Sequence, residues 1–224
     1  MSVELVIFDC DGVLVDTENI TNAWIADQIT AAGFPTTTGQ CRQRFVGLSM
    51  SAIRPKVIEE NGIDIGEDFV ARWETSSVAI FSVGVAPIVG VTRAVNWLKE
   101  NDIRYCVASS GTVEKMHMTL GSAGLLDEFR GVLFSSTMVP NGKPAPDLFL
   151  YAAEKMGVAP QNCVVIEDSP FGAQAANAAG IKCFGYTADP LTDAKGLAEQ
   201  GASLFTSMSD LTDLITPNRN EEAN

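Results

Sequence analysis

LVIFDCDGVLVD, residues 5–16, begins with a short apolar run, residues 5–8, which is followed by two acids and a glycine, Asp9, Asp11 and Gly12. Apolar residues followed at once by turn-forming residues predict a strand buried on both faces, as in a parallel sheet. Acids that follow such a strand lie at the sheet edge where α/β proteins bind their ligands. This stretch therefore predicts an α/β fold and the position of a polar site.

Further apolar runs predict more strands of the same Rossmann-like parallel sheet, with helical spacing of apolar residues between them. Residues 91–98 show that spacing, and Ser169 followed by Pro170 is typical of a helix start, with Gly180 near its end. The predicted strands are Leu5–Asp9, Arg104–Ser109, Val132–Ser135, Cys163–Glu167 and Lys182–Gly185.

A gap separates the first predicted strand from the second. Within it, Phe69, Trp73 and Ile80 recur on one helical face, so we expect an all-helical inserted cap domain over residues 17–86. The core domain, with the parallel sheet, would then comprise residues 1–16 and 87–224. Trp24 and Trp73 are expected to pack in the core of the insert.

The composition limits the possible partners. The chain has 224 residues, 46% of them hydrophobic, and a net charge of −13, which disfavours binding to nucleic acid or to anionic membranes. We find neither a membrane-span pattern nor a basic N-terminal start, and expect a cytoplasmic protein, a monomer with a dimer as the alternative. The five cysteines form no close pair and are expected to be reduced thiols.

Polar and charged residues follow several of the predicted strands. Each alone is more typical of a turn or a helix cap, but together they predict one crevice with several carboxylates. Two carboxylates about 4 Å apart repel by about 4 kcal/mol at an effective dielectric constant of 20, so a cation is expected, and oxygen ligands suit Mg²⁺. A phospho-accepting receiver domain is a rival, but it needs neither a late acid pair nor a helical insert. The residues are Asp9, Asp11, Ser109, Ser110, Lys143, Glu167 and Asp168.

At residues 9–16 the chain resembles the haloacid dehalogenase-like hydrolases, whose first motif is a hydrophobic strand followed by DxDGxLxD. Later motifs of that family follow in order: Ser109 after a strand, Lys143 within GKPAPD, and the pair Glu167 and Asp168. The resemblance spans residues 3–187 and is strongest to the β-phosphoglucomutase-like group, which carries a helical cap after the first motif.

The resemblance implies a role for each motif residue. Asp9 would be the nucleophile that forms an aspartyl-phosphate, and Asp11 the general acid and base. Mg²⁺ would lie between the Asp9 carboxylate, the Asp11 carbonyl, Glu167 and Asp168. The residues expected to hold the transferring phosphoryl group are Ser109 and Lys143, with backbone N–H groups near Gly12 and Ser110.

The insert is expected to supply the substrate contacts. Residues 28–58 contain no acid but include Arg42, Arg44, Arg54 and Lys56. A solvated helix face would explain any one of these cations. The turn RFVGLS at 44–49 resembles the cap segment that contacts the leaving group in this family. Arg44, Gly47 and Ser49 are therefore the predicted substrate-binding residues.

Single positions separate the branches of the family. Dehalogenases lack an acid at the place of Asp11, and phosphonatases carry a cap lysine near the place of Met50. True mutases have a histidine, a lysine and an arginine where this chain has Thr21, Val46 and Met50. The sequence therefore predicts a Mg²⁺-dependent phosphatase of sugar or sugar-acid phosphates, phosphogluconate among them. The alternatives are a sugar-phosphate mutase and a catalytically silent phosphate-binding protein.

Overall fold

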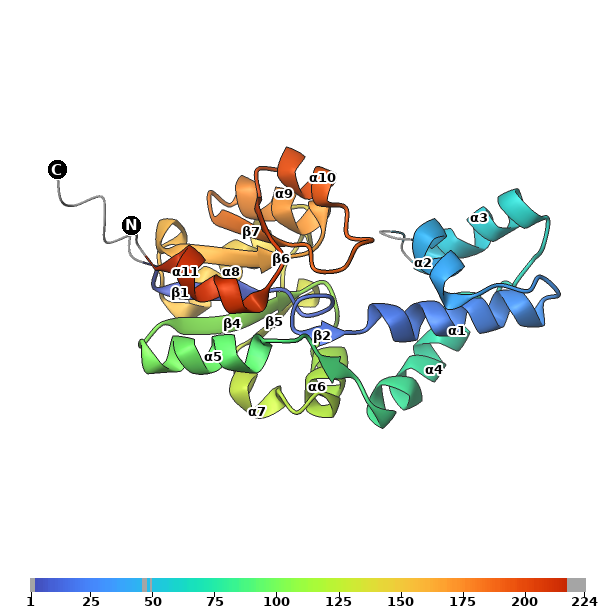
Figure 1. Cartoon of the computed structure of the whole chain (residues 1–224), viewed down its shortest axis with the longest axis horizontal. Helices are drawn as coiled ribbons and strands as arrows, with labels where there is room; N and C mark the ends of the chain where they lie inside the picture. Colours follow the sequence, from blue (N-terminus) through green and yellow to red (C-terminus); the bar gives the residue numbers. More distant parts are fainter. Residues whose placement is uncertain (1–2, 46–47, 49, 217–224) are drawn as a thin grey trace.

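The computed structural model of the chain describes residues 3–45, 48 and 50–216. A six-stranded parallel sheet forms its centre, in the order β5-β4-β1-β6-β7-β8. β1 lies in the middle, paired with β4 on one side and β6 on the other (Figure 1). The strands are β1 Leu5–Phe8, β4 Arg104–Ser109, β5 Leu133–Ser135, β6 Cys163–Glu167, β7 Lys182–Tyr186 and β8 Ser203–Phe205. The predicted α/β class and parallel sheet are confirmed.

Helices cover both faces of the sheet, because the apolar side chains of each strand alternate between two hydrophobic clusters. Val6 and Phe8 of β1 pack with α5, α6, α7 and α11, whereas Leu5 and Ile7 pack with α8, α9 and α10. These helices are α5 Val91–Glu100, α6 Val113–Ser122, α7 Leu126–Phe129, α8 Asp147–Met156, α9 Pro170–Ala178, α10 Ala194–Glu199 and α11 Leu211–Ile215. The result is a three-layer α/β/α core.

Helix ends follow the local sequence. The Ser169 hydroxyl caps α9 by accepting a hydrogen bond from the Gly172 N–H at 3.1 Å, and Pro170 is the first residue of that helix. Thr112 caps α6 in the same way through the Lys115 N–H at 3.2 Å. The predicted helix start at Ser169 is therefore confirmed.

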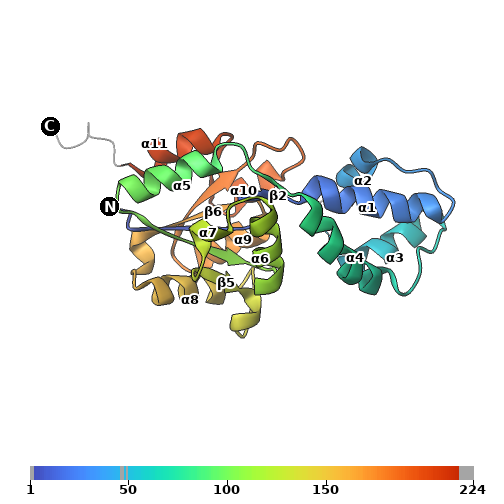
Figure 2. The same cartoon turned by 90° about the horizontal axis from the view of Figure 1, so that it is seen from below.

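Four further helices form an insert to one side of the core (Figures 1 and 2). They are α1 Glu18–Ala31, α2 Thr38–Phe45, α3 Met50–Asn61 and α4 Phe69–Val83. Trp24 packs against Phe69 and Trp73, each with ring centroids 5.2 Å apart, within a hydrophobic cluster of the insert's own. The two tryptophans therefore stabilise the insert, as predicted.

The chain enters and leaves the insert through two short strands, β2 Val15–Asp16 and β3 Ala86–Pro87, which pair antiparallel. Two residues are too few to produce an alternating pattern, so no pattern in the sequence predicts these strands. We propose that this strand pair marks the boundary between the core and residues 17–86.

Two expectations from composition concern the chain as a whole. All five cysteines are free and buried in the described structure, as predicted. Among the described residues, no helix combines the length and the apolar character that crossing a membrane requires.

Candidate active site

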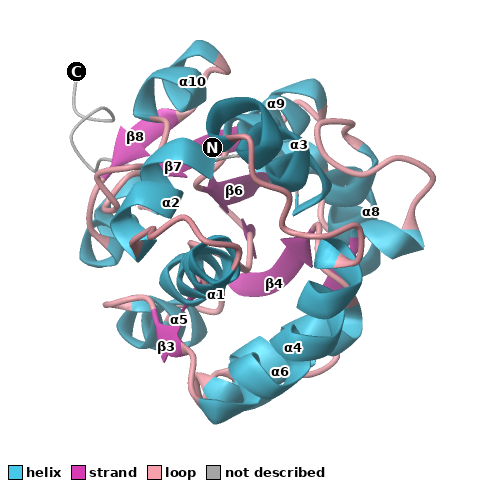
Figure 3. Ribbon diagram, turned by 90° about the vertical axis from the view of Figure 1, so that its right-hand side faces the viewer, coloured by secondary structure: helices cyan, strands magenta, loops and turns pink. Residues whose placement is uncertain are grey.

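Three neighbouring strands, β1, β4 and β6, bring the predicted polar residues to one edge of the sheet. In Figure 3, which views the molecule from the side of the insert, α1 lies in front of this edge. The turn after β1 depends on Gly12, whose φ of 78° is favourable only for glycine. A Cβ atom at Gly12 would lie 1.9 Å from the Asp168 Oδ2 atom, so the glycine also allows Asp168 to approach the turn.

Lys143 joins the acids of β1 and β6. Its Nζ atom lies 2.6 Å from the Asp9 Oδ1 atom and 2.6 Å from the Glu167 Oε1 atom, and its side chain is only 4% exposed. Burial raises the pKa of Asp9 to about 7 despite the Lys143 ammonium, and the Glu167 carboxylate adds to the rise. Burial alone would lower the pKa of Lys143, but Asp9 and Glu167 hold it above its ordinary value.

Asp9, Glu167 and Asp168 can each direct one carboxylate oxygen to a common point, with those atoms within 4.8 Å of one another. The other Glu167 oxygen accepts hydrogen bonds from the backbone N–H groups of Asp168 and Ser169, at 3.0 and 2.9 Å. Burial, followed by the charges of Glu167 and Asp9, raises the pKa of Asp168 well above its ordinary value.

No hydrogen bond to the Asp168 carboxylate occurs within the part of the chain that the structure describes. Asp168 is half-buried, and its neighbouring acids and lack of a donor favour the protonated carboxyl unless a cation binds beside it. Because the whole donor set is oxygen, these residues fit Mg²⁺ better than a softer metal.

Asp11 has two partners of its own. The Thr17 hydroxyl donates to its Oδ1 atom at 2.7 Å, and the Lys115 ammonium donates to its Oδ2 atom at 2.8 Å. Burial alone would raise the pKa of Asp11, but the Lys115 charge and the two hydrogen bonds hold it below its ordinary value. The Asp11 carboxylate is therefore ionised near neutral pH in the substrate-free protein.

Ser109 ends β4 beside the same turn. Its side chain is buried, and its Oγ atom accepts a hydrogen bond from the Gly111 N–H at 3.0 Å. A Cβ atom added at Gly111 would lie 3.4 Å from the Ser109 Oγ atom and 4.0 Å from the Asp11 Oδ2 atom. The Ser109 hydroxyl and the Asp11 carboxylate therefore both lie beside Gly111. Ser110 is exposed, and its carbonyl accepts a hydrogen bond from the Ser136 hydroxyl at 2.8 Å.

The residues of the insert that were expected to contact the substrate lie in different places. The Arg44 guanidinium lies 2.6 Å from Glu60 Oε2 and 2.5 Å from Asn61 Oδ1, both at the end of α3. Arg44 therefore links two helices of the insert, and it is not among the described residues that line the cavity beside the acids. Gly47 and Ser49 lie outside the described residues.

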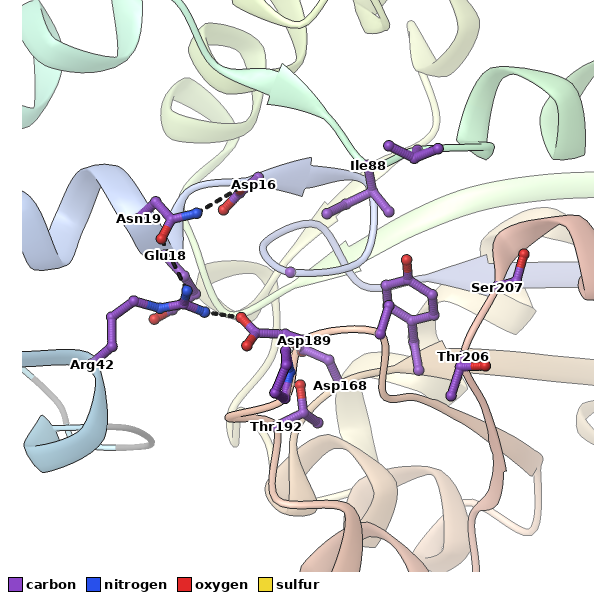
Figure 4. A pocket seen from close by; sticks show the side chains of 15 residues that line it. Asp16, Glu18, Asn19, Arg42, Ile88, Asp168, Asp189, Thr192, Thr206 and Ser207 are labelled. Atoms are coloured by element: carbon purple, nitrogen blue, oxygen red, sulfur yellow. Dashed lines mark hydrogen bonds and ion pairs between the residues drawn. The ribbon is translucent and has the colours of Figure 1, made fainter. Parts of the chain in front are cut away.

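Arg42, two residues earlier on α2, does line that cavity, which has a volume of about 440 Å³ (Figure 4). The sequence placed Arg42 in the acid-free window but gave no reason to prefer it to Arg44. The two arginines are two residues apart on α2, so their side chains lie on different faces of that helix.

Lys115, which the sequence did not single out, lies at the candidate site and pairs with Asp11. The charge of the four predicted carboxylates and a bound phosphate exceeds that of Mg²⁺ and Lys143, and the cations of residues 28–58 were the expected source of further positive charge. The structure shows that α6 of the core supplies a second ammonium, at Asp11. Lys115 lies three residues after the Thr112 cap, in the first turns of the helix that follows Ser109. This position was the only feature of the sequence that could have indicated it.

Comparison with known proteins identifies the family. The family model "Haloacid dehalogenase-like hydrolase" matches residues 6–186. The chain therefore belongs to the haloacid dehalogenase-like hydrolases, as its motifs indicated, and its relatives in that family include proteins named as phosphatases.

Three similar proteins illustrate this relationship. The 6-phosphogluconate phosphatase of Escherichia coli is 30% identical over 95% of this chain and 94% of its own. A fructose-1-phosphate phosphatase of the same organism is 33% identical over 78% of this chain and 92% of its own. The crystal structure of a hydrolase of this family from Deinococcus radiodurans, with bound phosphate and sodium, has a TM-score of 0.85 and 28% identity over 95% of each chain.

Proposed function

We propose that this chain is a Mg²⁺-dependent phosphatase that hydrolyses a sugar or sugar-acid phosphate through an aspartyl-phosphate on Asp9. One observation carries the proposal: Lys143 bridges Asp9 and Glu167 beside the Asp168 carboxylate, which accepts no hydrogen bond from the described residues. A lone structural ion pair would need neither the third carboxylate nor the cavity that opens next to it.

In the first step, an oxygen of the Asp9 carboxylate attacks phosphorus as the bond from phosphorus to the leaving oxygen breaks. Asp11 donates a proton to that oxygen, which leaves as an alcohol. The negative charge of the bound phosphate favours protonation of Asp11, against the effect of Lys115. Lys143, the Ser109 hydroxyl and backbone N–H groups near Gly12 and Ser110 hold the phosphoryl oxygens.

In the second step, water attacks the phosphorus of the aspartyl-phosphate. Asp11, now ionised, accepts a proton from that water, and the bond between the Asp9 oxygen and phosphorus breaks to release inorganic phosphate. Thr17 and Lys115 hold Asp11 for both proton transfers, since each hydrogen bond fixes one carboxylate oxygen. The Asp9 carboxylate is regenerated.

Bound Mg²⁺ would offset the charge of the acids and of the phosphoryl group during transfer. The residues that would hold it are Asp9, Glu167 and Asp168, together with the Asp11 carbonyl. Their fit rests on the oxygen-only donor set and on the raised pKa values of Asp9 and Asp168.

Two positions disfavour the mutase alternative. A mutase must hold a second phosphate, and the Met50 side chain carries no charge that could bind it. The Thr21 hydroxyl already donates a hydrogen bond to the Thr17 carbonyl at 2.9 Å. Val46 lies outside the described residues. Every catalytic position of the motifs is occupied, and Lys143 pairs with both Asp9 and Glu167, which disfavours a silent phosphate-binding protein.

A panel of phosphorylated metabolites, assayed with Mg²⁺ and with excess chelator, tests the proposal. We expect hydrolysis of sugar phosphates with Mg²⁺ and none with chelator. Asp9→Asn, which keeps the shape of the side chain but loses the nucleophile, should leave the circular dichroism spectrum intact and activity below a few per cent. Full activity in chelator, or in Asp9→Asn free of contaminating phosphatase, would refute the mechanism.

A further inference from the structure

The cavity beside the acids is the space into which a leaving group must extend. Gly12 and Asp168 form its inner end, next to the proposed phosphoryl site. Glu18, Asn19 and Arg42 of the insert line it from one side (Figure 4). From the core, its lining includes Tyr186, Asp189, Pro190, Thr192, Thr206 and Ser207. A substrate bound through its phosphate therefore contacts both the insert and the core.

Among the described residues of this lining, the one arginine, Arg42, already has an ionic and a hydrogen-bonding partner. The Nη2 atom of Arg42 forms an ion pair with Asp189 across the cavity, and its Nη1 atom donates to the Asn19 Oδ1 atom at 2.9 Å. Asp189 is held in place in turn, because its other oxygen accepts the Leu191 N–H at 2.9 Å. The Arg42 charge is thus compensated by the protein itself, and Figure 4 shows both contacts as dashed lines.

The rest of the lining is negative or neutral. Asp16, Glu18 and Asp168 add carboxylates, and only Asp168 belongs to the proposed metal site. The other polar groups are the amide of Asn19, the phenol of Tyr186 and the hydroxyls of Thr192, Thr206 and Ser207. Such a surface offers hydrogen bonds to hydroxyl groups and repels a second anionic group.

We propose that the leaving group is an uncharged polyol, so that the substrate is the monophosphate of a neutral sugar or sugar alcohol. Asp189 is the specificity-determining residue: by pairing with Arg42, it occupies the position that a substrate carboxylate or second phosphate would otherwise take. This inference rests on the proposed phosphatase function and narrows its substrate class. The proposed substrate class differs from the substrate in the name of one relative, the 6-phosphogluconate phosphatase, because that substrate carries a second anionic group.

Two substrates of equal length test the charge preference. Glucitol 6-phosphate and 6-phosphogluconate differ at carbon 1, which is an alcohol in the first and a carboxylate in the second. We expect the wild-type kcat/KM to be about tenfold or more higher for glucitol 6-phosphate. Asp189→Asn should reduce that preference about tenfold, because it frees Arg42 for one charge-assisted hydrogen bond.

A second variant and a control complete the design. Arg42→Gln removes the only cation of the described lining and should increase the preference for glucitol 6-phosphate. Glu199→Gln removes a carboxylate that pairs with Lys195 on α10 and is not in the cavity lining, so its preference should match that of the wild type. Thermal melting checks that each variant is folded.

The outcomes separate this inference from the proposed function. Equal or better hydrolysis of 6-phosphogluconate by the wild type would overturn the inference, as would an unchanged preference in both Asp189→Asn and Arg42→Gln. Hydrolysis of p-nitrophenyl phosphate without hydrolysis of either hexose derivative would also overturn it. No Mg²⁺-dependent hydrolysis of any of the three compounds would overturn the proposed phosphatase itself.

Discussion

The Asp168 carboxylate lies beside Glu167 and Asp9 and receives no hydrogen bond from the described residues, which makes its charge unfavourable in the metal-free protein. The raised pKa means that the ionised form is disfavoured in the native state relative to the unfolded chain. At neutral pH, Asp168→Asn should therefore raise the Tm of the metal-free protein, by about 2–4 °C for each 1 kcal/mol of stabilisation. The same substitution should abolish the Tm increase that Mg²⁺ causes.

Thermal melts of both proteins with chelator and with Mg²⁺ measure this effect. Asp213→Asn on α11, which also removes a single carboxylate, serves as the control and should retain the Mg²⁺ response. A lower Tm for metal-free Asp168→Asn would show that the carboxylate stabilises the native state without a cation.

Arg44 and Arg42 are two residues apart, but their partners give them different roles. Arg44 pairs with Glu60 within the insert, whereas Arg42 pairs with Asp189 of the core. Arg44→Ala should therefore lower the Tm and leave kcat/KM for sugar phosphates close to that of the wild type. Steady-state kinetics and a thermal melt on the same preparation distinguish the two effects. A large loss of kcat/KM at unchanged Tm would return Arg44 to the substrate-binding role that the sequence suggested.

At the scale of the elements, the first turn of α9 packs directly against the acid at the end of β6. A Cβ atom added at Gly172 would lie 1.8 Å from the Glu167 Oε1 atom, the atom that binds Lys143. Gly172→Ala should therefore displace Glu167, destabilise the protein and sharply reduce Mg²⁺-dependent activity. Chemical denaturation and kinetics measure both losses.

Gly121 provides the matched comparison, since it is also helical but has its nearest neighbouring atom at 3.8 Å, in Leu126. Gly121→Ala should be neutral or stabilising by about 0.5–1 kcal/mol, because alanine loses less backbone entropy in a helix. If both substitutions changed stability equally, crowding at Glu167 would not be the cause.

At the scale of the whole molecule, the acid cluster links stability to pH and to metal. The pKa of Asp9 rises from 3.8 to about 7 in the metal-free protein, so between these values the native state binds more protons than the unfolded chain. The free energy of unfolding should therefore decrease as pH rises through this interval. Metal ligands must be deprotonated, so the Tm increase caused by Mg²⁺ should be larger at about pH 7.5 than at about pH 5.5.

Melts in chelator and in saturating Mg²⁺ at the two pH values give this difference directly. Asp9→Asn, which cannot titrate at that position, should show a weaker dependence on pH. An equal Mg²⁺ effect at both pH values would mean that protons and the metal do not compete for these carboxylates.

The sequence by itself determined the fold class and the motif residues of the site. Buried strands of a parallel sheet are continuous apolar runs, and the acids follow β1 and β6 directly, so local sequence was enough to place Asp9 and Glu167 at one sheet edge. The short strands β2, β3 and β8 escaped detection, because two or three residues carry no periodic pattern.

Only the tertiary structure decided which cations serve the site. Lys115 meets Asp11 across 104 residues of sequence, and Arg42 meets Asp189 across 147. Such pairs depend on the packing of α6 against the core and on the position of the insert beside the sheet, neither of which local sequence encodes. The direction of a long side chain on a helix depends on the partner that it finds, and for Arg44 that partner was Glu60.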